Sequence, residues 1–229
     1  MAKYGTTQEQ MAMVRVNANA NAANNPYAHL RFEITLDMAL GTRIISWPLR
    51  LSDCCPRSDG ACALVYASEE KAKEITDNPA WVKAAGSISD TYWSGKSVSD
   101  WDSLAMLGRR IYRVAKIEKP IKEIDVAELY DAFTIQQILE LEALGFCDRG
   151  KGGKLVEKGA TKKDGDIPVN MSGGVLCTNP IGATAMVRVA EAALQVMSKA
   201  DQRQVADVET AIAHGWGGTL QFHGLMVLG

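Results

Sequence analysis

The segment Asn170–Thr184 constrains the fold of this chain more than any other stretch. Its sequence is NMSGGVLCTNPIGAT, in which three glycines, a proline and several small polar residues lead into an apolar helical pattern. Residues 213–218 add a second glycine-rich stretch, AHGWGG. Glycine loses more conformational entropy on folding than any other residue, so such a backbone usually marks a place where another group approaches the main chain closely. The two stretches predict a site that combines main-chain donors with a few polar side chains.

The composition is that of a globular protein with a substantial core. The chain has 229 residues, of which 47% are hydrophobic and 23% are charged. Its formal net charge of -2 gives no strong attraction to nucleic acid or to an anionic membrane, and it has no basic patch interleaved with aromatic residues. It shows no apolar run long enough to cross a membrane and no signal peptide, and its five cysteines follow no regular spacing. These features predict reduced thiols and a cytoplasmic location.

Alternating strand and helix patterns predict an α/β layered architecture. Capping signals and apolar periodicity predict helices over residues 6–23, 100–117, 134–144 and 183–197. Strand patterns cover residues 61–66, 81–89 and 121–126, and two more strands, joined by Gly217-Gly218-Thr219, are expected at the C-terminal end. Residues 148–167 have no apolar period and are expected to form a long surface loop.

Four stretches of the chain match motifs of one known family. They are residues 4–10 with the downstream Asn25-Pro26, Ser58–Ala61 (SDGA), Glu128–Phe133 (ELYDAF), and Asn170–Gly174 followed by Asn179–Thr184 (NMSGG and NPIGAT). As a set, these motifs resemble the C-terminal part of the thiolase superfamily, in the branch of sterol-carrier-type and archaeal or bacterial acyl-CoA thiolases. The resemblance covers essentially the whole chain, although each motif is weak by itself.

This resemblance implies a layered α-β-α fold, with a mixed five-stranded sheet and helices on both faces. It also implies that residues 1–77 are the incomplete tail of the N-terminal half-domain of a thiolase, and that residues 78–229 form the C-terminal domain. The nucleophilic cysteine of the family lies upstream of Met1. We therefore expect a partner chain that carries the missing half, in a homo- or hetero-oligomer. This branch of the family also suggests an accessory subunit with a zinc ribbon and an OB fold.

Three positions depart from the family pattern. The Gly-His-Pro motif of the family is Thr178-Asn179-Pro180 in this chain, so an amide replaces an imidazole. Tyr130 stands at the asparagine or histidine of the third motif. In the final loop, where many thiolases have Cys-x-Gly, this chain has His214-Gly215-Trp216. The catalytic groups therefore have to be predicted residue by residue.

Four residues are candidates for catalysis. His214 is the best candidate base, because an imidazole exchanges protons near neutral pH. Asn179 is expected to donate a hydrogen bond to a thioester oxyanion, and Tyr130 to donate from its phenol or to act as an acid. Asp131 is expected to orient a neighbouring group. Each also has a purely structural interpretation. His214 could cap a strand and Asn179 could belong to a turn. Tyr130 could be a half-buried ring and Asp131 an exposed carboxylate.

Two glycine pairs and two aromatic residues are expected to contact the substrate: Gly173, Gly174, Gly217, Gly218, Trp216 and Phe133. The amides would approach the thioester and the rings would line an acyl pocket, although aromatic residues more often belong to a core. His29 and His223 are predicted to be structural, and Cys177 is a minor candidate nucleophile.

Neither a metal nor a resident cofactor is expected. The adjacent Cys54 and Cys55 can hardly share one ion, and the chain has no Cys-x-x-Cys pair. The glycine spacing is that of neither a dinucleotide fingerprint nor a P-loop. Coenzyme A is instead expected as a substrate.

Three functions follow from these observations. The favoured function is an acyl-CoA C-acyltransferase that cleaves a β-ketoacyl-CoA with coenzyme A, or catalyses the reverse Claisen condensation, with the nucleophile on the partner chain. An alternative is a thiolase-like retro-aldolase that cleaves a β-hydroxyacyl-CoA without a cysteine nucleophile, which fits the loss of the motif histidine and the presence of Tyr130. The third is a non-catalytic subunit that binds acyl-CoA or serves as a scaffold.

Overall fold

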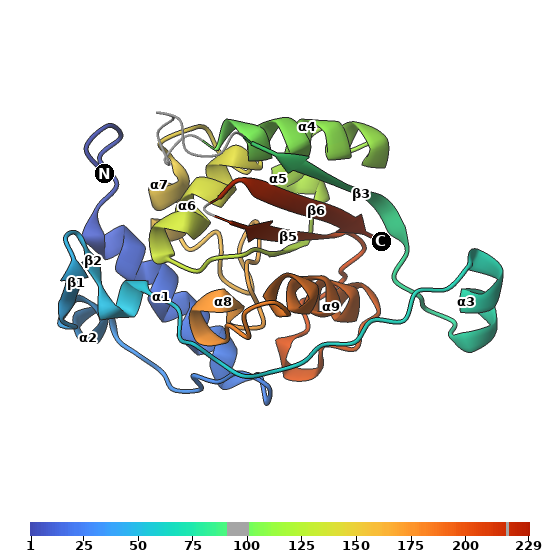
Figure 1. The fold of residues 1–229 in the computed structure, drawn as a ribbon, viewed down its shortest axis with the longest axis horizontal. Coiled ribbons are helices and arrows are strands. Elements are labelled where there is room, and N and C mark those ends of the chain that lie inside the picture. The colour runs from blue at the N-terminus through green and yellow to red at the C-terminus, as the bar shows by residue number, and fades with distance from the viewer. Residues whose placement is uncertain (91–100, 219) are drawn as a thin grey trace.

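A mixed four-stranded sheet organises the part of the chain that the computed structural model describes, which is residues 1–90, 101–218 and 220–229. The strand order is β3 (Val82–Ser89), β6 (Phe222–Leu228), β5 (Ala211–Gly217) and β4 (Val126–Glu128) (Figure 1). The β3–β6 and β6–β5 pairs are antiparallel, and β4 runs parallel to β5. The predicted layered α/β fold with a mixed sheet is confirmed, but the described residues supply four strands to this sheet rather than five.

Helices cover the two faces of the sheet. Helix α4 (Asp102–Ala115) packs on β3 and β6, and α9 (Thr184–Val196) packs on β5 and β4 from the opposite face (Figure 1). Along β5, Ile212 joins the core under α4, whereas Ala211 and Ala213 join the core under α9. This alternation is what a strand buried on both faces requires, because successive side chains point to opposite faces.

The N-terminal helix α1 (Gln8–Ala23) is a second centre of packing. It contacts the short helices α2 (Leu36–Leu40), α7 (Gly152–Glu157) and α8 (Gly174–Cys177) and the helix α6 (Thr134–Ala143). The capping box predicted from the sequence is present: the Thr7 hydroxyl accepts from the amide of Gln10, and the Gln10 side chain accepts from the amide of Thr7.

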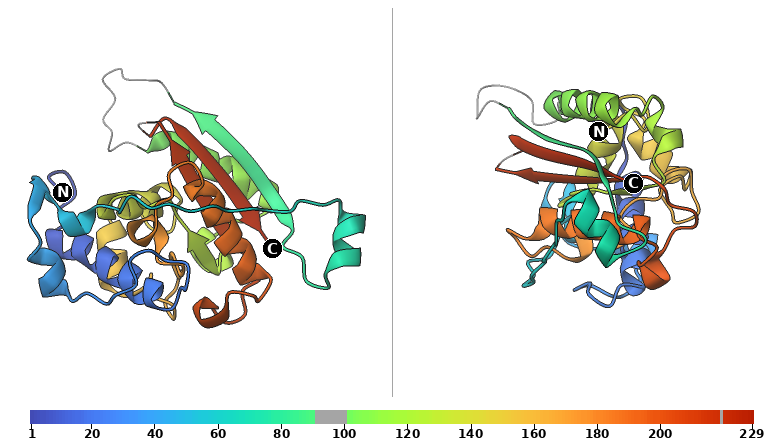
Figure 2. Two further views of the ribbon diagram at one scale, coloured as in Figure 1. Left: turned by 60° about the horizontal axis from the view of Figure 1, so that its bottom comes forward. Right: turned by 90° about the vertical axis from the view of Figure 1, so that its right-hand side faces the viewer.

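The remaining elements are short. A hairpin of β1 (Ile44–Ser46) and β2 (Leu49–Arg50) leads into the 3-10 turn η1 (Leu51–Asp53), and a second 3-10 turn, η2 (Asp201–Arg203), follows α9. Helix α3 (Glu69–Ile75) stands apart from the body of the molecule at the end of an extended segment (Figure 2). Among the described residues, no helix is both long enough and apolar enough to cross a bilayer.

Three predicted elements are wrong. Residues 61–66 form no strand, and Val65 is 91% exposed, because no neighbouring strand pairs with this segment in the described structure. Residues 120–123 form the short helix α5 (Pro120–Glu123), which proline favours at its first position, and the strand β4 begins only at Val126. The predicted loop over residues 148–167 contains α7.

The division predicted at residues 77 and 78 stays a prediction. Asp77 to Ala80 connect α3 to β3 without regular structure. The hydrophobic contacts of the larger core include residues from both sides of that point, with Met11 and Val14 of α1 alongside Leu104 and Leu107 of α4. The two predicted parts therefore share one core.

Candidate functional site

Polar side chains from three loops meet where α9 begins. Asn179 precedes the helix, Thr184 is its first residue, Tyr130 follows β4 and Cys55 follows η1. The Thr184 hydroxyl donates to Asn179 Oδ1 at 2.8 Å, and Asn179 Nδ2 donates to Cys55 Sγ at 3.2 Å. The Tyr130 hydroxyl lies near the Thr184 side chain. We call these four residues the donor cluster.

The donor cluster is neutral and partly open. Thr184 and Asn179 are buried, whereas Tyr130 and Cys55 are half-buried. Burial raises the pKa of the Tyr130 phenol and of the Cys55 thiol above their ordinary values, so both keep their protons at neutral pH. The second amide hydrogen of Asn179 has no partner among the described residues. The cluster can therefore donate hydrogen bonds to an incoming oxygen, but it contains no ready base.

Trp216 holds Tyr130 in place, and the next residue in the chain, Asp131, faces inward. The Trp216 indole donates to the backbone oxygen of Tyr130 at 2.9 Å, and the two rings pack with centroids 4.9 Å apart. Asp131 lies on the inner side and is fully buried rather than exposed. Its Oδ1 accepts from the Val175 amide at 2.7 Å and its Oδ2 from Gln137 at 3.0 Å. Burial, assisted by the nearby Glu140, raises the pKa of Asp131 to about 7.

His214 lies away from the donor cluster, on the face of β5 that meets α6. Its Nδ1 is 3.0 Å from Glu140 Oε1 and its Nε2 is 3.2 Å from His223 Nδ1. The ring is completely buried, and burial lowers its pKa to about 3. A side chain in this position contacts protein on all sides, so the structure gives no support to the prediction that His214 is the base that contacts the substrate.

The predicted substrate-facing glycines separate into two groups. Gly173 and Gly174 are buried, with φ of +93° and +65°. A Cβ atom at Gly173 would lie 2.5 Å from the Cβ of Ala22, and one at Gly174 would lie 2.5 Å from Asp131 Oδ1. These two glycines thus serve backbone conformation and packing in this structure.

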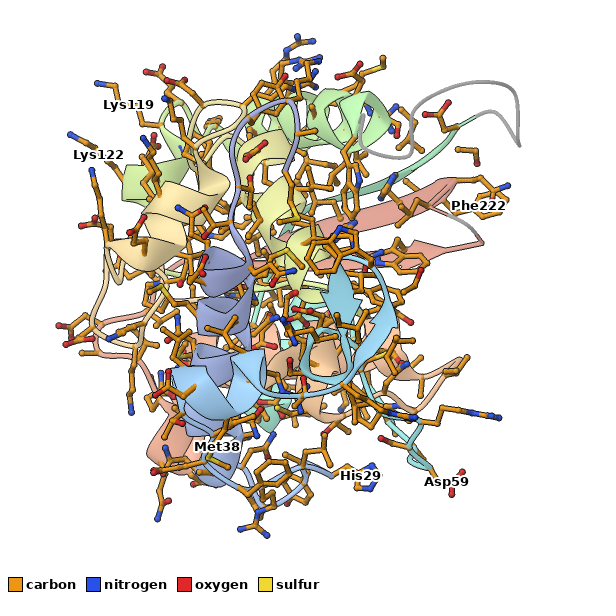
Figure 3. The ribbon with its side chains drawn as sticks, turned by 90° about the vertical axis from the view of Figure 1, so that its left-hand side faces the viewer. His29, Met38, Asp59, Lys119, Lys122 and Phe222 are labelled. Carbon is orange, nitrogen blue, oxygen red and sulfur yellow. The ribbon has the colours of Figure 1, made fainter. Side chains whose placement is uncertain are left out.

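The second group lies at the end of the β5–β6 hairpin, beside an apolar groove of about 540 Å³. Gly217 and Trp216 line this groove together with Leu64, Tyr66, Met186 and Phe222. Phe222 points outward at the end of the hairpin (Figure 3). Gly218 is exposed with φ of +66°. Phe133, in contrast, pairs with Cys54 through a β-bridge and does not line the groove.

The remaining candidates lie apart from the donor cluster. Cys177 is completely buried, and burial raises the pKa of its thiol to about 12, which disfavours a nucleophilic thiolate. His29 is exposed at the edge of the molecule (Figure 3), where its Nδ1 lies 2.9 Å from the hydroxyl of Ser58. That hydroxyl also accepts from the backbone amide of Asn179 at 3.1 Å. No group of three or more possible metal ligands occurs among the described residues.

Two members of the donor cluster were not predicted. Cys55 was considered only as a metal ligand, and Thr184 only as part of a motif. The Asn179–Cys55 hydrogen bond joins residues 124 positions apart, which no local pattern in one sequence reveals.

Residues 93–229 match the family model described as thiolase C-terminal domain-like. The chain belongs to this family. The resemblance to the thiolase superfamily that the motifs indicated is thereby confirmed.

The curated relatives carry thiolase names. The chain is 40% identical over 222 residues to an acetyl-CoA acetyltransferase of Methanothermobacter thermautotrophicus, which covers 96% of this chain and 57% of the relative. It is 34% identical to sterol carrier protein 2 of Oryctolagus cuniculus, over 95% of this chain and 41% of the relative. It is also 32% identical to the benzoylsuccinyl-CoA thiolase subunit BbsB of Thauera aromatica, over 95% of this chain and 57% of the relative. The chain thus spans about half the length of these proteins.

Solved structures agree on the fold. A structure titled Ltp2-ChsH2(DUF35) aldolase superposes with a TM-score of 0.87 at 28% identity, over 100% of this chain and 60% of that one. The acetyl-CoA acetyltransferase of Bacillus anthracis superposes with a TM-score of 0.66 at 18% identity, over 99% of this chain and 57% of that one, which supports the fold alone.

Proposed function

We propose that the chain forms part of an acyl-CoA C-acyltransferase, in which the donor cluster binds the oxygen of an acyl-CoA thioester. The reaction is the cleavage of a β-ketoacyl-CoA by coenzyme A, or the reverse condensation, with coenzyme A as a substrate. Relatives named acetyl-CoA acetyltransferase, at up to 40% identity, support this reaction class.

The observation that carries the proposal is the hydrogen bonding of Asn179. Thr184 donates to the amide oxygen of Asn179, and one amide hydrogen of Asn179 is donated to Cys55. These two hydrogen bonds fix the plane of the Asn179 amide. The second amide hydrogen and the Tyr130 phenol are then available as donors. Negative charge develops on the thioester oxygen when the neighbouring carbon becomes an enolate, and preorganised donors stabilise that charge strongly. In this proposal the nucleophile and the base belong to other parts of the active enzyme.

The test is the rate of coenzyme-A-dependent cleavage of a β-ketoacyl-CoA by the protein together with every chain that copurifies with it. Asn179→Ala should lower kcat without loss of the folded state, because the side chain donates to the reacting oxygen. The matched control is Asn24→Ala, since the amide of exposed Asn24 only contacts the carbonyl of Ala20. Equal rates for the two variants would contradict the proposed role of the donor cluster.

A second candidate is retro-aldol cleavage of a β-hydroxyacyl-CoA. Two observations favour it: the similarity to a structure titled as an aldolase, and a donor cluster with a phenol and an amide but no imidazole. The β-hydroxyl would lose its proton to a base outside the donor cluster as the Cα–Cβ bond breaks, and the Tyr130 phenol would donate a hydrogen bond to that oxygen. Release of an aldehyde or ketone from a β-hydroxyacyl-CoA without added coenzyme A would identify this reaction. Failure of both assays in the complete complex would leave a binding subunit as the function.

We further propose that the active enzyme contains a chain segment or subunit beyond these residues. The relative named as a thiolase subunit and the solved structure titled Ltp2-ChsH2(DUF35) aldolase support this. The second chain that we propose includes a small accessory subunit with a zinc ribbon and an OB fold. The intact mass of every chain that copurifies under native conditions tests it. A stoichiometric second chain is expected, and a monodisperse, active chain of 24.8 kDa would contradict the proposal.

A further inference from the structure

Three buried titratable side chains form a connected set on the face of the sheet away from α9. Glu140 belongs to α6, His214 to β5 and His223 to β6, and the two histidine rings stack with centroids 5.4 Å apart. Trp101 packs beside them, with its ring centroid 5.6 Å from that of His223. Their hydrogen bonds run from Glu140 Oε1 to His214 Nδ1 and from His214 Nε2 to His223 Nδ1. We call these three residues the buried relay.

The direction of these hydrogen bonds follows from the other oxygen of Glu140. Oε2 is buried and has no hydrogen-bond partner among the described residues. An ionised carboxylate would need donors on both oxygens, whereas a carboxyl protonated on Oε1 donates to His214 and leaves only a carbonyl oxygen unpaired. His214 Nδ1 then accepts, and His214 Nε2–H donates to His223 Nδ1. When the proton moves from Glu140 to His214, Nδ1 becomes the donor to Glu140, and the direction from His214 Nε2–H to His223 Nδ1 stays the same.

Burial acts in the same sense. It raises the pKa of Glu140 well above its ordinary value and lowers the pKa of His223 to about 4. The charged neighbours are Arg188 of α9 and Asp131 on the side of Glu140, and Asp90 on the side of His223. We assign a neutral hydrogen bond rather than an ion pair to Glu140 and His214, because both side chains are completely buried.

The last residue of the buried relay, His223, lies on β6 directly opposite Trp216 of the neighbouring strand β5. In the β5–β6 register, His223 pairs with Trp216, whose indole donates to the Tyr130 backbone. Gly215 and Gly217 flank Trp216 and contribute no side-chain contacts. Strand β3 pairs with β6 as far as Phe222, and on the α6 side the polar contacts of His214 and His223, with Trp101 packed beside them, hold the β5 strand.

We propose that Glu140, His214 and His223 are positioning residues that fix the end of the β5–β6 hairpin through a one-way hydrogen-bond chain and thereby set Trp216 against Tyr130. The effect on catalysis rests on the function proposed above. The hydrogen-bond direction and its effect on Trp216 do not, so they can be tested separately.

The first test is the protonation state of each imidazole nitrogen, measured by ¹⁵N NMR on the unmodified protein at neutral pH. The chain has three histidines, so His29→Gln identifies the signals of His29, and His223→Gln then separates those of His223 from those of His214. The expected result is a proton on Nε2 of His214, with Nδ1 of His223 acting as an acceptor. A proton on His214 Nδ1 together with a bare Nε2 would overturn the proposal, because the hydrogen bonds would then run the opposite way.

The second test compares Glu140→Gln with Glu140→Leu. The glutamine amide can still donate to His214 Nδ1, whereas leucine cannot. Loss of one hydrogen bond corresponds to about tenfold faster hydrogen exchange of the Trp216 indole proton in the leucine variant, with near-normal exchange in the glutamine variant. Trp216→Phe assigns that signal. An unchanged exchange rate of the indole proton in the folded leucine variant would overturn the proposal. If that variant does not fold, the ¹⁵N measurement on the unmodified protein decides.

The activity assay then separates the two proposals. A shift of Trp216 and Tyr130 should lower kcat about tenfold in Glu140→Leu and leave it near normal in Glu140→Gln. If the protein shows no acyl-CoA activity at all, the proposed function fails. The ¹⁵N NMR and indole hydrogen-exchange measurements still test the buried relay in that case.

Discussion

The donor cluster and the buried relay lie near the same strand, and both are neutral at neutral pH, yet they differ in what they leave unused. In the donor cluster, Asn179 keeps an amide hydrogen without a partner, and Tyr130 and Cys55 are half-buried. In the buried relay, every imidazole nitrogen that faces another member is paired, and His214 and Glu140 are completely buried. The first set therefore keeps an unused donor beside half-buried side chains, whereas the second is enclosed by its own hydrogen bonds.

The difference teaches that residue type alone does not locate a site. A histidine next to a carboxylate has the composition of a general base and its orienting acid. Burial disfavours charge on that pair, whereas an asparagine with one unused donor beside two half-buried side chains retains a group that can donate to an oxyanion.

The largest expected effect concerns the donor cluster. Asn179→Ala should lower kcat by about 10²- to 10³-fold, the usual loss on removal of one oxyanion donor, and should lower the free energy of unfolding by about 1–2 kcal/mol because the bonds to Thr184 and Cys55 are lost. Steady-state kinetics and urea denaturation of the same preparation measure both quantities. A variant that loses stability but keeps kcat would break the comparison, because Asn179 would then be as structural as His214.

The next effect tests whether the buried glycines serve packing. Gly174→Ala combines a positive φ with a Cβ 2.5 Å from the Asp131 carboxylate, so we expect a loss of about 2–4 kcal/mol in the free energy of unfolding. Gly182→Ala is the matched control, since its φ is +98° but no atom lies within 4 Å of the added Cβ. It should lose only about 1–2 kcal/mol. Similar losses for the two variants, measured by urea denaturation, would show that packing adds nothing at Gly174.

A smaller effect sharpens the role of Tyr130 within the donor cluster. Tyr130→Phe removes the phenol but keeps the ring that packs on Trp216, so kcat should fall about tenfold to a hundredfold while KM changes little. The assay should be run with both a β-ketoacyl-CoA and a β-hydroxyacyl-CoA. Intact turnover of the β-hydroxyacyl-CoA in this variant would remove retro-aldol cleavage through Tyr130 from consideration.

The smallest effect concerns Asp131, which is completely buried next to Tyr130 in the chain. Its pKa of about 7 in the folded protein is above that of the unfolded chain, so the folded state favours the protonated form. Its contribution to stability is therefore lost as pH rises through about 7. Between pH 6 and pH 8 the free energy of unfolding should fall by about 1 kcal/mol more in the wild type than in Asp131→Asn. Exposed Asp37→Asn is the control and should follow the wild type.

Elements with local signals were predictable from the sequence. The capping box at Thr7, the glycine at residue 145 after α6 and the glycine-rich turn between β5 and β6 all act through neighbouring residues. Helix α7 gave little such signal, because two glycines and a single valine form its buried residues. A Cβ at Gly152 would lie 2.5 Å from the backbone oxygen of Ile138, so the side that packs has no apolar period to recognise.

The candidate site was predictable only in part. The motif positions of Asn179 and Tyr130 suggested that they act together, and both belong to the donor cluster. The roles of Thr184 and Cys55 depend on contacts between distant segments. The burial of His214 depends on Glu140, which lies 74 positions earlier in the chain and faces it from another element. Residue type suggests chemistry, but the solvent exposure that decides it is a property of the folded molecule.

The strand order has a consequence for how the protein is made. The two central strands, β5 and β6, are the last of the sheet to leave the ribosome, whereas the outer strands β3 and β4 are synthesised long before. Until residues 211–228 emerge, both outer strands lack their sheet partners, and their unpaired edges are open to wrong association. Sheet formation must also bring Glu128 next to Ala213 across a long intervening stretch, which slows folding. We therefore expect the nascent chain to depend on chaperones until its final strands are complete.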